Sequence, residues 1–249
     1  MFAKKICSVL IAGVMLFASL SVQAKNYRRL LNRHYQKAET SAEAIRPLLQ
    51  KYARLYNENP RLLEAVVFPE LMRYNAVFNV IETGSLMSLY TRLGSDYADF
   101  SIGRFQMKPS FALSVENYVL QNTDKPWARA LKFDEISTED TYEARSARID
   151  RLSDVEWQVK YLIAVFKCIK QKHAAYLNKI SLRQQIVFIA TAYNCGWDKS
   201  TATINCFTTK CYYCISPWQT GRKYNFADIA LQRFAELKYP NKAIAYTAA

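Results

Sequence analysis

Residues 99–112 read Asp-Phe-Ser-Ile-Gly-Arg-Phe-Gln-Met-Lys-Pro-Ser-Phe-Ala, and the rest of the chain can be interpreted outward from this stretch. Gly103 lets the backbone turn tightly or pass close to a ligand. Gln106 carries an amide that can both donate and accept hydrogen bonds. Pro109 suits the first turn of a helix, which residues 110–122 would supply. The stretch therefore predicts a loop that presents one polar side chain and then enters a helix.

The composition favours helices. The chain has 249 residues, of which 51% are apolar, so it can bury a sizeable core. Only six glycines and seven prolines occur, and stretches rich in Leu, Ala, Lys, Arg and Gln favour helices over a many-turned β-fold. We expect an all-α, mainly helical fold with at most one short β-hairpin, near Asp96–Phe105.

The first 24 residues resemble a secretory signal. Lys4 and Lys5 precede the apolar run Ile6–Leu20, and small residues at Val22 and Ala24 predict cleavage after Ala24. A membrane anchor is the alternative, but a run of about 15 apolar residues is short for a span. We therefore expect an exported protein, periplasmic or secreted, without a stable membrane span. Residues 25–249 would form one helical domain.

The net charge indicates an anionic partner. Loss of Lys4 and Lys5 on cleavage lowers the formal charge from +13 to +11. Such a basic exported protein is expected near a cell-wall polymer, a membrane surface or nucleic acid. The sequence carries no zinc-finger, RRM or helix-turn-helix signature, and export argues further against nucleic acid as the partner.

Five cysteines follow the signal, and four of them lie in a predicted loop at 195–221: Cys168, Cys195, Cys206, Cys211 and Cys214. In an oxidising compartment disulfides are the first interpretation, although an odd number leaves at least one thiol free or paired with another chain. Zinc held by the loop cysteines is the alternative. We favour disulfides and expect no metal site and no cofactor.

Caps and apolar periodicity predict the remaining elements. Residues 25–37 are expected to be a solvated basic lead-in. Helices are then predicted from the capping box Thr40–Glu43 to Tyr56, over Arg61–Asn75 with a disturbance near Pro69, over Ala76–Leu93, from the capping box Ser153–Glu156 onward, over Leu182–Tyr193 after Ser181, and from Asn225 to about Lys238. The region 123–153 has no clear pattern.

Two glutamates are candidate catalytic acids. Glu70 lies on a strongly apolar helix, where desolvation would raise its pKa and keep it protonated, as a general acid requires. The alternative is that Glu70 is an ordinary surface acid that pairs with Arg73 or Arg54. Glu82 could be a second carboxylate, since many glycosidases use two, or merely a structural acid of its own helix.

A phenol and an amide end the apolar helix before Gly196. Tyr193 and Asn194 could point into a cleft, while Asn194 and Gly196 could also form an ordinary helix C-cap. A cysteine nucleophile is not favoured, because both histidines, His34 and His173, lie in basic runs that predict solvent exposure. No phosphate loop, Gly-x-Ser-x-Gly or His-Glu-x-x-His motif occurs.

Three segments in this order resemble the lysozyme-like superfamily of soluble lytic transglycosylases and goose-type lysozymes. In that family a catalytic Glu ends an apolar helix, a Gly-Leu-Met-Gln-x-x-Pro-x-Thr stretch follows, and Ala-Tyr-Asn-Ala-Gly comes much later. Here the corresponding segments are Ala65–Glu70, Gly103–Ser110 and Ala192-Tyr-Asn-Cys-Gly196. The resemblance covers residues 59–196 and implies a lysozyme-like fold.

The resemblance also implies roles. Glu70 would be the acid and base, Gln106 would hydrogen-bond the glycan, Tyr193 would hold and orient the carboxyl, and Asn194 would shape the floor of the cleft. Ser101 and Gly103 of the same loop join the expected substrate-binding residues.

The chain departs from the family pattern at three places. Leu71 follows Glu70 where the family has Ser, and Cys195 replaces the usual Ala. The interval from Glu70 to Gly103 is longer than usual, as though the helix at 76–93 had been inserted, and the interval from Glu82 is closer to the family's. Glu82 therefore stays the alternative acid. We prefer Glu70 because residues 66–68 resemble the family's buried approach to the acid.

The expected function is cleavage of the β-1,4 bond between N-acetylmuramic acid and N-acetylglucosamine in peptidoglycan, with glycan strands as the partner. The alternative is a non-catalytic peptidoglycan-binding or secretion-accessory protein that keeps the fold, which Leu71 favours. A disulfide-stapled exported toxin or adhesin rests only on the cysteines.

Overall fold

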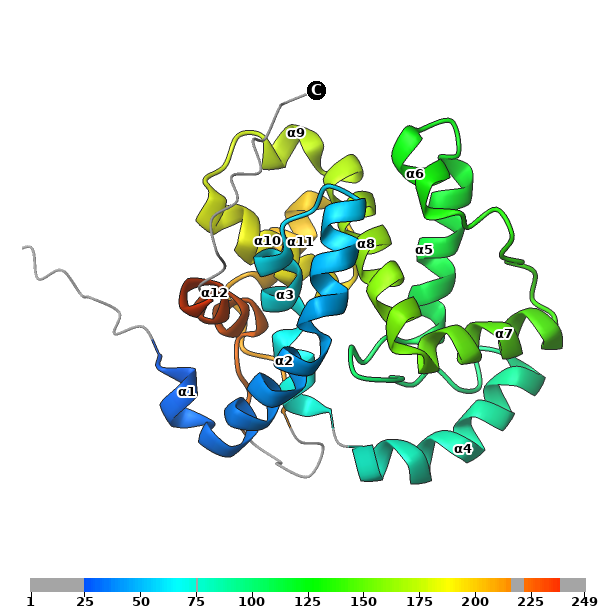
Figure 1. Cartoon of the computed structure of the whole chain (residues 1–249), viewed down its shortest axis with the longest axis horizontal. Helices are drawn as coiled ribbons and strands as arrows, with labels where there is room; N and C mark the ends of the chain where they lie inside the picture. Colours follow the sequence, from blue (N-terminus) through cyan, green and yellow to red (C-terminus); the bar gives the residue numbers. More distant parts are fainter. Residues whose placement is uncertain (1–24, 75, 216–221, 238–249) are drawn as a thin grey trace, which may run out of the picture.

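The computed structural model describes residues 25–74, 76–215 and 222–237, and within them it confirms the all-α prediction (Figure 1). The predicted signal at 1–24 lies outside these residues. Twelve helices occur in the described part: α1 (Tyr27–Leu30), α2 (Asn32–Leu55), α3 (Pro60–Arg73), α4 (Ala76–Leu93), α5 (Pro109–Gln121), α6 (Pro126–Leu131), α7 (Tyr142–Ser153), α8 (Val155–Lys172), α9 (Ala174–Leu177), α10 (Leu182–Cys195), α11 (Thr201–Phe207) and α12 (Phe226–Glu236).

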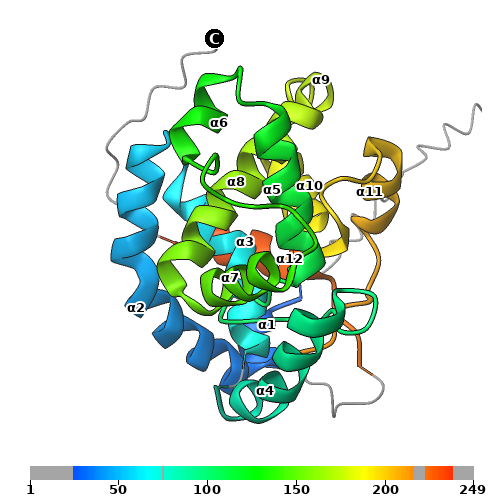
Figure 2. The ribbon, with the colours of Figure 1, turned by 90° about the vertical axis from the view of Figure 1, so that its right-hand side faces the viewer.

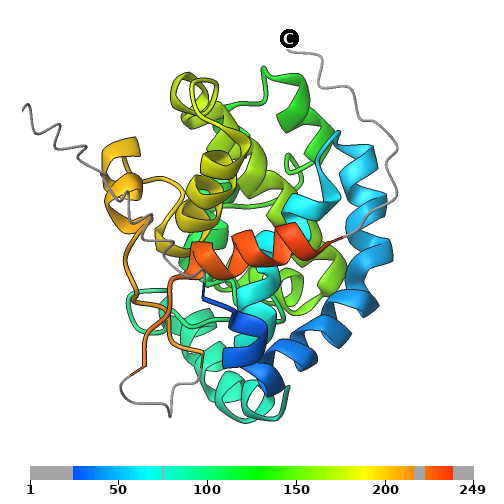
Figure 3. The same ribbon diagram turned by 90° about the vertical axis from the view of Figure 1, so that its left-hand side faces the viewer.

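Helix α3 lies at the centre of one group of helices. The side chain of Asn59 accepts the backbone N–H of Arg61, Pro60 occupies the first turn, and every residue from Leu62 to Met72 is buried. Helices α2, α10 and α12 pack around it, and Figure 3 shows α12 crossing in front of α3. A helix enclosed on all sides brings any polar residue that it carries out of contact with bulk water.

A second group consists of α4 to α7, and α8 joins it to the first. Helix α8 packs against both α2 and α5, whereas α4 packs mainly on α7 at the edge of the molecule (Figure 2). A buried charge cluster holds this group together. Glu116 on α5 forms salt bridges of 2.8 Å with Arg148 and 3.0 Å with Arg151, both on α7. The hydroxyl of Tyr161 on α8 donates to the same carboxylate.

The prediction of a solvated lead-in is wrong. Tyr27 and Tyr35 are 1% and 0% exposed, because α12 covers them. The backbone N–H of Tyr27 donates to Gln232 over 2.8 Å, and the Tyr35 hydroxyl donates to Glu236 over 2.6 Å. Helix α2 begins at Asn32, so the predicted capping residue Thr40 lies inside a helix.

Two further local predictions are corrected. The hairpin expected near 96–105 is reduced to one bridge between Ile102 and Met107, since the chain turns at once into α5. The loop predicted at 195–221 contains the helix α11. The caps predicted at Ser181 and Asn225 are confirmed, whereas α8 is capped by Asp154 rather than Ser153.

The cysteines of the described residues are all free thiols, so the expected disulfides are not seen. Cys168 is fully buried on α8 in the core, while Cys206 and Cys211 are exposed on α11 and the segment after it. The described part of the chain also holds no group of three or more His, Cys, Asp or Glu side chains that could bind a metal ion. Among the same residues, no helix is long and apolar enough to cross a membrane.

Candidate active site

Glu70 occupies the last turn of α3, and its side chain is buried, with 4% of its surface exposed. Burial raises the pKa of this carboxyl from 4.5 to about 7. The positive charge of Arg73 and hydrogen bonds from Tyr213 and Asn194 oppose that rise. The carboxyl is therefore protonated for part of the population near neutral pH, which a proton donor requires.

Glu70 differs from the other buried glutamates of the described residues in its charge partners. Glu58, Glu64 and Glu116 each form salt bridges with two basic side chains. Among the described residues Glu70 forms none within salt-bridge distance. A buried carboxyl whose pKa is raised toward neutrality and that has no salt bridge is a candidate to exchange its proton.

Tyr213 makes the direct contact with Glu70 that sequence analysis assigned to Tyr193. Its hydroxyl lies 3.2 Å from Oε2 of Glu70 and 2.7 Å from the carbonyl oxygen of Pro69. The segment that carries Tyr213 is fixed by an antiparallel bridge to Tyr224, where the two residues exchange backbone hydrogen bonds of 3.1 and 2.8 Å. No local pattern announces this role, because the partner lies 143 residues earlier in the chain.

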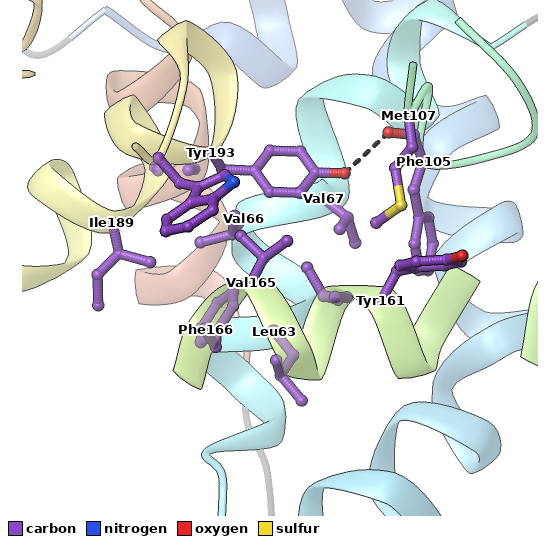
Figure 4. Close-up of a cluster of buried hydrophobic side chains, with 14 of the residues drawn as sticks. Leu63, Val66, Val67, Phe105, Met107, Tyr161, Val165, Phe166, Ile189 and Tyr193 are labelled. Atoms are coloured by element: carbon purple, nitrogen blue, oxygen red, sulfur yellow. Dashed lines mark hydrogen bonds between the residues drawn. The ribbon is translucent and has the colours of Figure 1, made fainter. Parts of the chain in front are cut away.

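Tyr193 instead holds the turn at 103–106. Its hydroxyl donates to the carbonyl oxygen of Phe105 over 2.9 Å, as the dashed line in Figure 4 shows. The ring of Tyr193 extends from α10 across Val66 and Val67 of α3 toward Phe105 and Met107 (Figure 4). Burial and the nearby charge of Glu70 raise its pKa well above the ordinary value. Tyr193 thus connects α10 to the loop at 103–106 and lies near the Glu70 carboxyl, but its hydroxyl bonds Phe105 rather than Glu70.

The turn itself has a strained backbone. Gly103 and Gln106 both have positive φ angles, +68° and +51°, of which only the first suits its residue type. The Nε2 amide of Gln106 donates to the carbonyl oxygen of Gly103 over 2.8 Å. Ser101 and Gln106 are half-buried. The predicted glycan-binding amide therefore lies at the surface of a tightly closed turn and takes part in closing it.

Asn194 lies at the end of α10, where Gly196 with φ +116° follows as the C-cap. Its side chain hydrogen-bonds Glu70, and its Oδ1 atom is buried with no hydrogen-bond partner among the described residues. The hydroxyl of Tyr212 is likewise buried and unpartnered there. Unsatisfied buried groups beside a proton-exchanging carboxyl are typical of a functional site.

The other candidates do not join this group. Glu82 lies on α4, in a part whose side chains fall outside the described residues. His173 is buried, contrary to prediction, and bonds Thr201 and the Trp197 carbonyl. His34 lies 3.3 Å from the carbonyl oxygen of Met72.

The three motifs that were far apart in sequence thus converge. Helix α3 supplies Glu70, and α10 supplies Tyr193 and Asn194. The loop before α5 supplies Phe105, and the segment after α11 supplies Tyr213. Comparison with protein-family models, curated proteins and solved structures finds no match.

Proposed function

We propose that the protein is a lytic transglycosylase that cleaves the β-1,4 bond between N-acetylmuramic acid and N-acetylglucosamine in peptidoglycan. The observation that carries the proposal is the buried, hydrogen-bonded carboxyl of Glu70, which lacks a salt bridge among the described residues and has a pKa of about 7. The segment of Glu70, the loop motif and the helix motif are also the three segments in which the sequence resembles lytic transglycosylases. Export to the periplasm or the medium belongs to the same proposal.

The reaction needs one carboxyl. Protonated Glu70 gives its proton to the glycosidic oxygen while the bond from that oxygen to the anomeric carbon of the muramic acid breaks. The substrate's own N-acetyl group stabilises the developing cation. Ionised Glu70 then takes a proton from the 6-hydroxyl of the same sugar as that oxygen bonds to the anomeric carbon. The product is a 1,6-anhydro sugar, and Glu70 regains its proton. Attack by water instead would give hydrolysis.

The basic charge supports docking on the substrate. Peptidoglycan strands carry carboxylates, and a net charge of +11 after removal of the signal favours their approach. Charge increases the rate of encounter more than it selects a substrate, so recognition of the sugar falls to the residues around Glu70.

Digestion of purified sacculi tests the proposal. Residues 25–249 are incubated with peptidoglycan, and the soluble products are analysed by mass spectrometry. We expect anhydro-muropeptides from the wild-type protein and none from Glu70→Gln, whose folding is checked by circular dichroism and thermal unfolding. Glu82→Gln is the matched control and should keep its activity. Full activity of Glu70→Gln together with loss in Glu82→Gln would transfer the acid to Glu82.

A non-catalytic role in peptidoglycan binding or as a secretion accessory is the second candidate. Leu71 stands where the family has Ser, and the amide of Gln106 already bonds within its own turn. If the wild-type protein sediments with sacculi but releases no soluble product, this second function replaces the first.

A further inference from the structure

Two side chains from distant helices hold the backbone on both sides of Phe105. The backbone N–H of Phe105 donates to Oε1 of Gln158 over 2.9 Å, and its carbonyl oxygen accepts from the Tyr193 hydroxyl over 2.9 Å. Gln158 belongs to α8 and Tyr193 to α10. Both peptide groups that flank Phe105 are therefore fixed in orientation by partners outside the turn.

Gln158 itself is held in one orientation. It is 1% exposed, and its Nε2 amide donates to the carbonyl oxygen of Leu152 over 2.7 Å. Because that carbonyl requires a donor, the amide must present its oxygen to the N–H of Phe105. The amide also fills the space above Gly103, where a Cβ atom would lie only 1.8 Å from Nε2. Gln158 and Gly103 are thus matched to one another.

The residue after this fixed peptide is Gln106, with a φ angle of +51° that a side-chain-bearing residue rarely adopts. Such a conformation persists only where its surroundings enforce it. The backbone hydrogen bond from Gln106 N–H to the Gly103 carbonyl is long, at 3.2 Å, and does not account for the conformation by itself. The Nε2 amide of Gln106 also donates to that carbonyl over 2.8 Å. The fixed peptides on both sides of Phe105 add a constraint from outside the turn.

We propose that Gln158 is a positioning residue that sets the conformation of the turn at 103–106, the turn that would contact the glycan strand in the proposed function. This inference rests on the proposed function, because it names the residue that prepares that function's substrate-binding turn. Gln158 acts only through the turn and touches neither Glu70 nor the reacting bond. Its loss therefore weakens binding of the strand and leaves the proton transfer at Glu70 intact.

The test compares Gln158→Met, Gln158→Glu and Tyr90→Phe at pH 5. Methionine keeps the volume and removes both hydrogen bonds. A buried glutamic acid is protonated at this pH and can still accept from Phe105 and donate to Leu152. Tyr90→Phe is the matched control. It removes the buried hydrogen bond of 2.8 Å that Arg148 donates to the Tyr90 hydroxyl, and this bond joins α7 to α4, away from the turn. Binding of soluble glycan strands is measured calorimetrically in a Glu70→Gln background, so that no strand is cut.

We expect Gln158→Met to weaken strand binding by about tenfold relative to the Glu70→Gln parent protein. Gln158→Glu and Tyr90→Phe should bind strands with nearly the affinity of that parent. In the otherwise wild-type chain, Gln158→Met should raise KM and leave kcat nearly unchanged. Hydrogen exchange at the Phe105 amide should accelerate in Gln158→Met alone.

Unchanged binding in Gln158→Met, or equal loss in Gln158→Glu, would overturn the inference while the proposed function stands. Failure of the parent protein to bind any strand would overturn both. If the wild-type chain binds strands but never cleaves them, the catalytic proposal falls, and a selective loss of binding in Gln158→Met still supports the positioning role.

Discussion

The hydroxyl of Tyr213 lies within hydrogen-bond distance of Glu70, 3.2 Å from its Oε2 atom, although 143 residues separate the two in the chain. This hydrogen bond favours the ionised carboxylate and lowers the pKa that burial raises. It therefore sets the pH at which the proton donor is lost. Tyr213→Phe should raise the pKa of Glu70 and shift the alkaline limb of the kcat–pH profile upward by about one pH unit. Tyr193→Phe, whose hydroxyl bonds Phe105 instead, is the control and should leave this limb in place.

The wild-type profile follows from the same carboxyl. A general acid must carry its proton, and the pKa of Glu70 is about 7, so kcat should fall as the pH rises through 7. Turnover of a soluble glycan substrate between pH 5 and 9 measures this limb. A rate that stays constant across this range would contradict Glu70 as the acid.

Stability should depend on the same proton. The pKa of Glu70 is about 7 in the folded protein, against the ordinary value of 4.5 that applies to the unfolded chain. The folded state therefore binds this proton more tightly. Its contribution is fully present below pH 4.5 and is lost as the pH rises through 7, a difference of about 3 kcal/mol. Glu70→Gln should therefore unfold at a higher temperature than the wild type at pH 8, and the advantage should shrink toward pH 5.

Two glycines should respond in opposite ways to the same substitution. Gly103→Ala would place a Cβ atom 1.8 Å from Gln158 at a φ angle of +68°, and we expect a loss of about 3 kcal/mol of unfolding free energy. A Cβ atom at Gly84 on α4 meets nothing within 4 Å, so Gly84→Ala should stabilise by about 0.5–1 kcal/mol. Urea unfolding of both variants measures the contrast.

The charge cluster around Glu116 should be costly to break. Glu116→Gln removes the partner of Arg148, which is 1% exposed, and we expect a loss of about 3–5 kcal/mol. The exposed pair of Asp124 and Lys125 is the control, and Asp124→Asn should cause no measurable change. Equal melting temperatures for Glu116→Gln and the wild type would show that the cluster does not stabilise the fold.

Thiol labelling should separate the cysteines. Cys206 and Cys211 are exposed, whereas burial raises the pKa of Cys168 far above its ordinary value and hides it from reagents. Brief iodoacetamide treatment of the native protein should label the first two and leave Cys168 unmodified until urea is added. Peptide mass spectrometry identifies the sites. Resistance of Cys206 and Cys211 in the non-reduced protein would indicate that they are paired in a disulfide.

Signals confined to a few residues predicted three helix starts correctly and placed two others wrongly. The caps at Asn59, Ser181 and Asn225 each bond a backbone N–H within three residues, so composition and spacing reveal them. The apolar neighbours of Glu70 on its own helix indicated that the carboxyl could be desolvated, although they left the surface acid open as an alternative.

Features that depend on distant partners were not predictable in this way. Tyr27 and Tyr35 are buried by α12, whose residues Gln232 and Glu236 hydrogen-bond to them. These partners lie more than 200 residues further along the chain, so no local pattern reveals them. His173 is enclosed by Trp197 and Thr201, which follow a later helix. The exchange of Tyr193 for Tyr213 as the partner of Glu70 has the same origin. The sequence contains 17 tyrosines, and without the tertiary contacts no local signal identifies Tyr213 among them.

The pairing of α12 with the start of the chain constrains how the polypeptide can mature. Arg233 closes a salt bridge of 2.7 Å with the fully buried Glu64, and Gln232 and Glu236 complete the surroundings of Tyr27 and Tyr35. A nascent chain that emerges amino end first would hold these groups unsatisfied until α12 had been synthesised. Closure of this part of the core therefore waits for α12, and loss of that helix would leave Tyr27, Tyr35 and Glu64 without these partners.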